Sequence, residues 1–205
     1  MDMTALFNIG YGLYVLTAAD GLKDNGCIIN TVSQITADPV RIIVGVNKQN
    51  LTHDMILKTG ELNLSVLNQD APFSVFQRFG FASGRNVNKF AEDATIFRAA
   101  NGIAYLPEYT NAMMACTVQD TVDMGTHTLF VVSIEQALTF NKVPTMTYSY
   151  YQSNVKPKPA AAAAPAGKKQ WVCRVCGHVY EGEELPADYI CPICKHGAVD
   201  FELQK

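Results

Sequence analysis

Short runs of apolar and β-branched residues recur along the chain and predict a series of β-strands. Gly, Asp, Asn or Pro bounds each run, and these residues favour turns and interrupt strands. Six runs of this kind occur, at residues 11–18, 27–35, 40–46, 62–67, 112–118 and 128–134. Six short strands favour a sheet that closes into a barrel, and therefore a mainly β fold.

Helical patterns are fewer. The first covers residues 52–59 and ends at Gly60, and the second covers residues 71–79 and ends at Gly80. Glycine is common just beyond the last residue of a helix, so both patterns predict short helices with a glycine C-cap. The chain contains neither a GxGxxG motif nor a P-loop, which disfavours a dinucleotide-binding Rossmann unit.

The pattern of apolar positions breaks at residues 152–169, which predict a linker. This stretch has no large apolar residue after Val155 and contains prolines at 157, 159 and 165. A mixed Pro and Ala composition favours a semi-extended chain without a core. We therefore expect one domain at residues 1–151 and a second at 170–205, which is too short to fold without a metal, disulfides or a partner.

Charge and composition narrow the function class. The 205 residues are 48% hydrophobic and carry a formal charge of −3, divided as −4, +4 and −3 between the first domain, the linker and the second domain. Such a chain lacks the basic surface that nucleic acids require. No apolar run approaches the ~18 residues of a membrane span, and residues 1–5 do not resemble a signal peptide. We expect a cytoplasmic protein with no nucleic-acid or membrane partner.

Four of the six cysteines lie in the second domain, as two C-x-x-C pairs. The pairs are Cys173 with Cys176 and Cys191 with Cys194, and fourteen residues separate them. Two such turns can bring four thiolates into a tetrahedron, the geometry of zinc or iron sites. The nearby His178 and His196 are expected on the surface rather than as ligands.

The remaining cysteines, Cys27 and Cys116, each lie in an apolar, strand-like stretch. An isolated cysteine in such a stretch behaves as a small core residue. We expect both to be buried structural residues.

Residues around the paired cysteines resemble rubredoxin. The resemblance covers the whole second domain and includes Trp171, Tyr180, the segment LPADYICPIC at 185–194 and Phe201. It implies a mononuclear iron that transfers one electron. The segment between the cysteine pairs is shorter than in free-standing rubredoxins, and Tyr189 stands where Trp is common. A structural zinc ribbon, which shares the cysteine geometry, is the alternative.

The first domain resembles the flavin reductase-like split barrel over nearly all of residues 1–151. The resemblance is carried by NTVSQIT at 30–36, by NKQNLTH at 47–53 and by GELNLSVL at 60–67. Further elements are Ser83-Gly84-Arg85 with Lys89-Phe90, and Gly125-Thr126-His127, although Asn88 and Thr126 replace the usual Asp residues. The implied fold is an FMN-binding split β-barrel with a few helices, characteristically a homodimer.

Candidate cofactor-binding residues follow from this resemblance and from their chemistry. Hydroxyl, amide and cationic side chains in loops and at a helix N-terminus suit the phosphate of FMN. The candidates are Asn30, Thr31, Ser33, Gln34, Lys48, Asn50, Leu51, Thr52, His53, Ser83 and Gly84. Taken singly, Thr52 also fits a helix N-cap, Ser33 an alternating strand position and Lys48 a solvated loop charge.

The sequence assigns no catalytic residue, although His127 is a candidate. It fits a core histidine at the start of an apolar strand, or, as the resemblance implies, a residue near the flavin and the entering nicotinamide. Hydride transfer requires two rings to be stacked and oriented rather than a particular acid or base.

The two domains together resemble the fusions called high-molecular-weight rubredoxins. Nicotinamide donates two electrons as hydride, an iron site accepts one, and a flavin can exchange either number. The resemblance implies an NAD(P)H-dependent FMN reductase that passes electrons to its iron and then to a terminal redox protein, a flavodiiron protein that reduces nitric oxide or dioxygen. Two alternatives remain: a flavin or ferric reductase with a structural zinc-ribbon tail that binds a partner, and a passive flavin-binding electron carrier.

Overall fold

A computed structural model describes residues 5, 8–91, 96–157, 169–174, 178–191 and 197–204. The chain divides into two compact units, Met1–Asn154 and Val155–Lys205. The expected linker at 152–169 lies outside the described residues from 158 to 168, whereas Lys169 already belongs to a strand of the second unit. None of the described helices has the length and apolar character that a membrane crossing requires.

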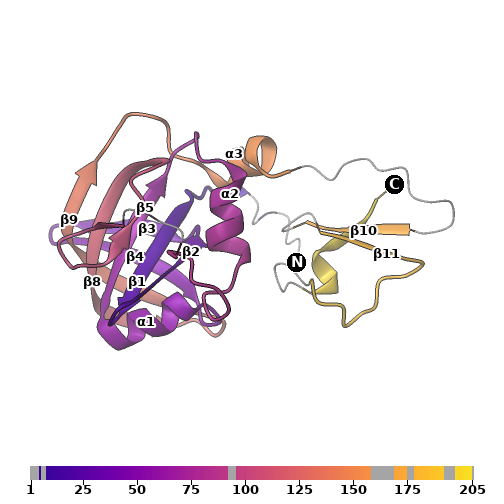
Figure 1. Ribbon diagram of the computed structural model, residues 1–205, viewed down its shortest axis with the longest axis horizontal. Helices are drawn as coiled ribbons and strands as arrows, with labels where there is room; N and C mark the ends of the chain where they lie inside the picture. The colour runs from indigo at the N-terminus through magenta and orange to yellow at the C-terminus, as the bar shows by residue number, and fades with distance from the viewer. Residues whose placement is uncertain are drawn as a thin grey trace. The chain divides into compact units, whose positions relative to one another are not determined.

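An antiparallel sheet of seven strands forms the first unit (Figure 1). Its strand order is β2-β1-β5-β8-β9-β4-β3. The strands are β1 (Tyr14–Asp20), β2 (Lys23–Ile29), β3 (Val32–Ala37), β4 (Val40–Asn47), β5 (Glu61–Leu67), β8 (Thr110–Asp123) and β9 (His127–Thr139). The expected strands at 40–46, 62–67, 112–118 and 128–134 are confirmed, and the last two extend into one long hairpin.

The segment at 27–35, expected as one strand, is two strands that belong to opposite edges of the sheet. The first edge strand, β2, ends at Ile29, and the other edge strand, β3, starts at Val32. Only Asn30 and Thr31 join them, so the chain itself connects the two edges and the sheet forms a split barrel. The expectation of one strand was wrong because a continuous apolar run carries no signal for a change of pairing partner.

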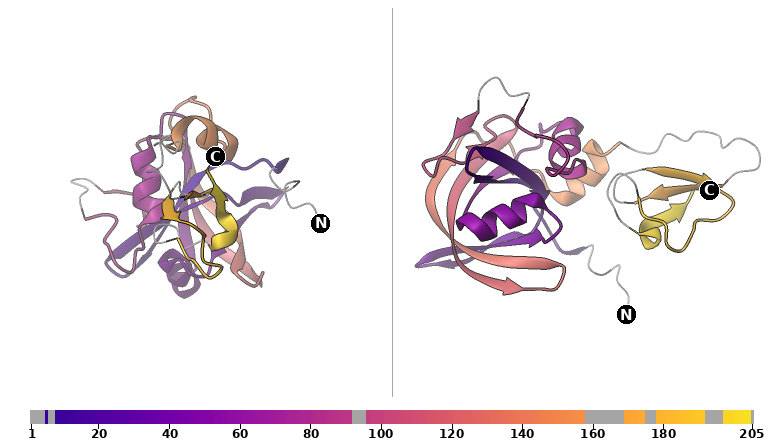
Figure 2. Two further views of the ribbon diagram at one scale, coloured as in Figure 1. Left: turned by 90° about the vertical axis from the view of Figure 1, so that its right-hand side faces the viewer. Right: turned by 60° about the horizontal axis from the view of Figure 1, so that its bottom comes forward.

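Short helices accompany the sheet, and the longest of those described is α1 (Leu51–Thr59). Helix α1 packs against β1 and β2, and Figure 2 shows it lying along the outside of the strands. It ends as expected at Gly60, which has a φ of 73° and donates its amide to the Ile56 carbonyl at 2.8 Å. Only a left-handed residue closes a helix in this way, and glycine adopts that conformation without strain.

The second expected helix, at 71–79, is present but has other bounds and ends in a π-helical turn. Helix α2 (Phe73–Phe76) begins after Pro72 and continues into a π-helical turn over Gln77–Phe81. Gly80 lies inside this turn rather than beyond it, and a Cβ there would meet Ile28 of β2 at 3.4 Å. The prediction of a glycine C-cap at this position was therefore wrong.

The remaining elements of the first unit are short. They are the pair β6 (Phe97–Arg98) and β7 (Ala104–Tyr105), and α3 (Tyr148–Tyr150), which runs into a π-helical turn at Tyr151–Val155. The core lies between the sheet and α1, and its fully buried side chains include Leu16, Val44, Val46, Ile56, Leu62, Leu64 and Phe130. Cys27 and Cys116 belong to this core, as expected, and burial raises the pKa of both thiols, that of Cys116 to about 12.

The second unit is a small sheet of three strands in the order β11-β10-β12. These are β10 (Lys169–Cys173), β11 (Val179–Gly182) and β12 (Phe201–Leu203), with a short 3₁₀ turn at Ala198–Asp200. Among the described residues, its hydrophobic cluster consists of Cys173, Cys191 and Phe201, packed against four partly buried side chains.

Candidate functional site

Several candidate cofactor-binding residues meet where β4 ends and α1 begins. Strand β4 pairs with β9 so that Asn47 lies opposite His127, and the Lys48 amide donates to the Thr126 carbonyl at 3.1 Å. The Lys48 ammonium also donates to Asp123 at 2.6 Å. Lys48 is therefore ion-paired rather than only a solvated loop charge, and His127 lies beside it at the same end of the sheet.

The first turn of α1 is tied to the sheet by buried polar side chains. Asn50, and not Thr52, is the N-cap residue of the helix. Thr52 lies inside the first turn, where its hydroxyl accepts a 2.9 Å hydrogen bond from the Asn25 amide of β2. The His53 Nε2 atom lies 2.9 Å from the Thr128 hydroxyl of β9. The N-cap interpretation of Thr52 was thus wrong, because a contact with a distant strand decides its position.

The Ser83-Gly84-Arg85 segment lies against the same helix. The Arg85 guanidinium donates to the Asp54 carboxylate at 2.6 Å, and this hydrogen bond, with a second from His53, holds the pKa of Asp54 below its usual range. Gly84 packs so closely on Asn25 that a Cβ would lie 2.1 Å from the amide oxygen. Only glycine fits at this contact, which brings the backbone of residue 84 next to the Asn25–Thr52 pair.

Lys89, which follows this segment, fixes it to neighbouring elements through hydrogen bonds to backbone carbonyls. Its ammonium is buried and donates to the Gly26 carbonyl at 2.7 Å and to the Phe79 carbonyl at 3.2 Å. Burial lowers the pKa of this lysine. The contact joins the segment to β2 and to the π-helical turn.

Asn30 and Thr31 form the connection between the edge strands β2 and β3. The Thr31 carbonyl accepts from the Gly45 amide at 2.9 Å, and a Cβ on Gly45 would come within 2.9 Å of the Thr31 methyl group. Thr31 is therefore packed on β4, near the end that leads to α1. Its hydroxyl is exposed and donates to Asn30 at 3.2 Å.

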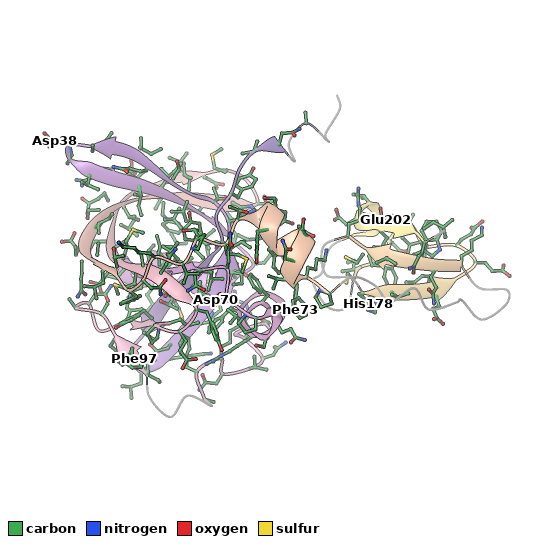
Figure 3. All side chains as sticks on the ribbon, turned by 90° about the horizontal axis from the view of Figure 1, so that it is seen from above. Asp38, Asp70, Phe73, Phe97, His178 and Glu202 are labelled. Carbon is green, nitrogen blue, oxygen red and sulfur yellow. The ribbon has the colours of Figure 1, made fainter. Side chains whose placement is uncertain are left out.

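Ser33 and Gln34 lie farther from this junction. They occupy the exposed edge strand β3, paired with Ile43 and Ile42 of β4, so the register carries them away from the β4–α1 end. Gln34 donates to the Thr36 carbonyl near the tip of the β3–β4 hairpin, which Asp38 marks in Figure 3. Within one chain, the structure does not bring these two side chains to the first turn of α1.

His127 is exposed, so the alternative of a buried core histidine is wrong. Its Nδ1 atom lies 2.9 Å from the Thr126 hydroxyl. It stands at the rim of the junction with Lys48 and the Thr126 carbonyl. The buried histidine of this region is instead His53, which is 4% exposed.

Sequence reasoning missed Asn25, Asp54 and Thr128, which hold the candidate residues in place. Each bonds to a candidate residue or to its support: Asn25 to Thr52, Asp54 to Arg85 and Thr128 to His53. All three of these bonds connect positions far apart in the sequence. No local pattern marks such residues, although a buried strand that contains polar residues, as β2 does, is a weak signal.

The donor set at this junction fits a flavin phosphate. The first amides of a helix have no intrahelical acceptor, and they favour an anion together with the helix dipole. Leu51, partly buried, and Thr52 supply such amides, and the hydroxyl of Thr31 and the ammonium of Lys48 lie on the flanking segments. The Asp123 carboxylate offsets part of the Lys48 charge, and Lys48 in turn lowers the pKa of Asp123.

Cys173 and Cys191 come together in the second unit. Both are completely buried in the same cluster with Phe201, although they lie eighteen positions apart. The Cys173 amide donates to the His178 carbonyl at 2.8 Å, and Ile190 forms an isolated bridge with Gly197. Cys176, Cys194 and His196 lie outside the described residues. A sulfur donor set in which two thiols share a buried cluster fits a tetrahedral metal.

His178 is partly buried rather than a surface residue. Its Nε2 atom lies 3.1 Å from the Tyr189 hydroxyl. Tyr189 packs against Tyr180 at 4.6 Å and edge-on against Phe201 at 5.3 Å between ring centroids.

Comparisons with known proteins agree with both halves of the chain. The family model described as flavin reductase like domain matches residues 6–158, and the model described as rubrerythrin, rubredoxin-like domain matches residues 171–202. The high molecular weight rubredoxin of Moorella thermoacetica is 36% identical over 98% of this chain and 99% of its own length. The ferric-chelate reductase (NAD(P)H) of Archaeoglobus fulgidus is 34% identical over 77% of this chain and 93% of its own length.

Solved structures support the fold. The NADH:FAD oxidoreductase SgcE6 of Streptomyces globisporus C-1027, in complex with NAD and FAD fragments, superposes with a TM-score of 0.63. It covers 71% of this chain and 85% of its own at 18% identity, which shows a shared fold alone. The chain belongs to the flavin reductase-like family and joins that split barrel to a C-terminal rubredoxin-like domain, as its resemblance to high-molecular-weight rubredoxins implies.

Proposed function

We propose that this protein oxidises NAD(P)H with FMN bound at the β4–α1 junction and passes the electrons singly to an iron held by Cys173, Cys176, Cys191 and Cys194. The observation that carries the proposal is the presence of a flavin reductase-like domain and a rubredoxin-like domain in one chain. Bound flavin supplies the exchange between two-electron and one-electron chemistry.

The residues of the junction would bind and orient the reactants. The amides of Leu51 and Thr52, with the Lys48 ammonium, would hold the phosphate at the start of α1. The Asn25–Thr52 and His53–Thr128 hydrogen bonds keep this helix turn fixed on the sheet. The exposed His127 lies at the rim, where an entering nicotinamide would meet it.

The acceptor and the assembly are part of the proposal. The resemblance along nearly the whole chain to a high molecular weight rubredoxin supports an outlet to a further redox protein, for which we propose a flavodiiron protein. A homodimer would bring Ser33 and Gln34 of the exposed edge strand β3 into a site completed by a second copy. Size measurement in solution tests the dimer independently of the chemistry.

An anaerobic visible spectrum before and after NADH tests the electron path. We expect NADH, or NADPH, to bleach the flavin bands and then the bands of the ferric thiolate site. Cys173→Ser is the matched control, because it removes an iron ligand and leaves the β4–α1 junction unchanged. In this variant the flavin bands should still bleach while the iron bands are absent. A wild-type chain whose flavin bleaches but whose iron stays oxidised would contradict the proposal.

A ferric reductase with a structural zinc tail is the second candidate. The similarity to the ferric-chelate reductase of Archaeoglobus fulgidus, confined to about three quarters of this chain, favours it for the first domain. Metal analysis of the purified protein separates the two. Zinc in the cysteine site would support this candidate, and iron would support the electron outlet.

A further inference from the structure

The hydrogen bond between His178 and Tyr189 joins the two metal-binding segments of the rubredoxin-like domain. His178 follows the first cysteine pair by two positions, and Tyr189 precedes Cys191 by two. The His178 Nε2 atom and the Tyr189 hydroxyl lie 3.1 Å apart in a partly buried position. Figure 3 labels His178, which immediately precedes strand β11.

Each partner of this hydrogen bond is fixed on its own cysteine segment. The His178 carbonyl accepts from the Cys173 amide at 2.8 Å, so the position of the histidine is coupled to that of the first ligand. The Tyr189 amide donates to the Pro186 carbonyl at 3.0 Å, and its ring packs on Tyr180 and Phe201. The hydrophobic cluster of the domain is small, since its buried members in the described part of the chain are Cys173, Cys191 and Phe201.

We propose that the His178–Tyr189 hydrogen bond is a latch that slows loss of the metal by resisting separation of the two cysteine segments. The inference rests on the metal site of the proposed function but not on electron transfer. A tetrahedral metal leaves only after some ligands separate, and in a domain with so small a core that separation is a local opening. His178 and Tyr189 are thus positioning residues, which act through the cysteine segments rather than on the metal.

The expected effect follows from the strength of one hydrogen bond. A partly buried hydrogen bond contributes about 1 kcal/mol, which corresponds to about fivefold in an opening equilibrium. Tyr189→Phe keeps the ring and its packing while it removes the hydroxyl. His178→Ala removes the other partner. Each variant should release metal about fivefold faster than the wild type.

The test measures release of iron from the full-length protein to a coloured chelator at constant temperature, with wild type and variants side by side. The double variant Tyr189→Phe with His178→Ala should be no faster than either single variant, because one shared interaction is lost. Tyr180→Phe is the matched control: it removes a hydroxyl from the same aromatic cluster, and no hydrogen bond of that hydroxyl is found in the described part of the chain. It should release metal at the wild-type rate.

A conservative replacement separates the latch from general destabilisation. Gln can present its side-chain nitrogen near the position of the histidine Nε2 atom, whereas Asn is shorter. His178→Gln should restore slow release and His178→Asn should not. A Tyr189→Phe protein that releases metal at the wild-type rate would overturn the latch. So would a double variant whose release rate rises by the product of the two single-variant increases. Retained metal that accepts no electrons would instead contradict only the proposed function, and a domain that binds no metal would contradict both.

Discussion

Asp54 shows how a single carboxylate links α1 to the segment that carries Gly84. Its carboxylate accepts from Arg85 at 2.6 Å and lies 3.2 Å from the His53 Nδ1 atom. Both side chains of the Asp54–Arg85 ion pair are half exposed, so the interaction is screened by salt and contributes modestly to stability. Its main consequence is the lowered pKa of Asp54.

This pKa predicts a specific loss of stability in acid. An unfolded aspartate titrates near pH ~3.9, and the folded pKa lies below that value. Between the two pKa values the unfolded chain binds more protons, so the free energy of unfolding falls as the pH falls through this window. At neutral pH, where Asp54 is ionised in both states, its full contribution is present.

Asp54→Asn should remove this pH dependence. The difference in free energy of unfolding between wild type and variant should be constant above about pH 5 and should shrink as the pH falls toward the folded pKa. Urea unfolding of both proteins across this pH range measures the difference in free energy of unfolding. The difference between wild type and Arg85→Gln should also shrink as the pH falls. A difference that is equal at every pH would contradict this assignment of the pKa shift.

At the scale of elements, the close contact between the residue 83–85 segment and β2 depends on Gly84. A Cβ there would lie 2.1 Å from the Asn25 side chain, which is buried and already bonded to Thr52. Gly84→Ala should therefore lower the free energy of unfolding by about 1–3 kcal/mol and weaken FMN binding, because either the loop or Asn25 must move.

Denaturant unfolding and flavin titration of Gly84→Ala check this prediction. Gly10→Ala provides the control, because a Cβ at residue 10 meets no atom within 4 Å. A Gly84→Ala protein as stable as the control, with unchanged flavin affinity, would show that the 83–85 segment does not need its contact with Asn25.

On the scale of the whole molecule, the two units should differ in their dependence on metal. The first unit has a large buried core, whereas the hydrophobic cluster found in the described part of the second unit has three buried residues, two of them the candidate ligands Cys173 and Cys191. A domain this small gains its folding free energy largely from the bound metal.

Removal of the metal should unfold the second unit alone. Hydrogen exchange after chelation should show loss of protection in β10, β11 and β12, while amides of β1, β5 and β8 stay protected. Cys173→Ser should show the same loss before any chelator is added. If the amides of β10 and β12 stay protected without metal, the apolar residues of the second unit are enough to keep it folded, and the prediction is contradicted.

Local features of the chain could be predicted because neighbouring residues determine them. The strands β4, β5, β8 and β9 follow from apolar runs between turn residues, and α1 ends at Gly60 because a left-handed C-cap favours glycine. Likewise, the two C-x-x-C pairs indicate a metal site, since a short spacing restricts where the thiols can lie.

Only the tertiary structure decided the contacts between distant segments. Three features each depend on a partner elsewhere in the chain: the division of 27–35 between two sheet edges, the position of Thr52 inside α1 and the hydrogen bond between His178 and Tyr189. Sequence periodicity reports which face of an element is apolar but not which strand or loop will cover it. The sequence by itself therefore determined strands β4, β5, β8 and β9, the end of α1 at Gly60 and the cysteine pairs. Strand register and long-range hydrogen bonds determined how the candidate site is built, because they join segments that no local pattern connects.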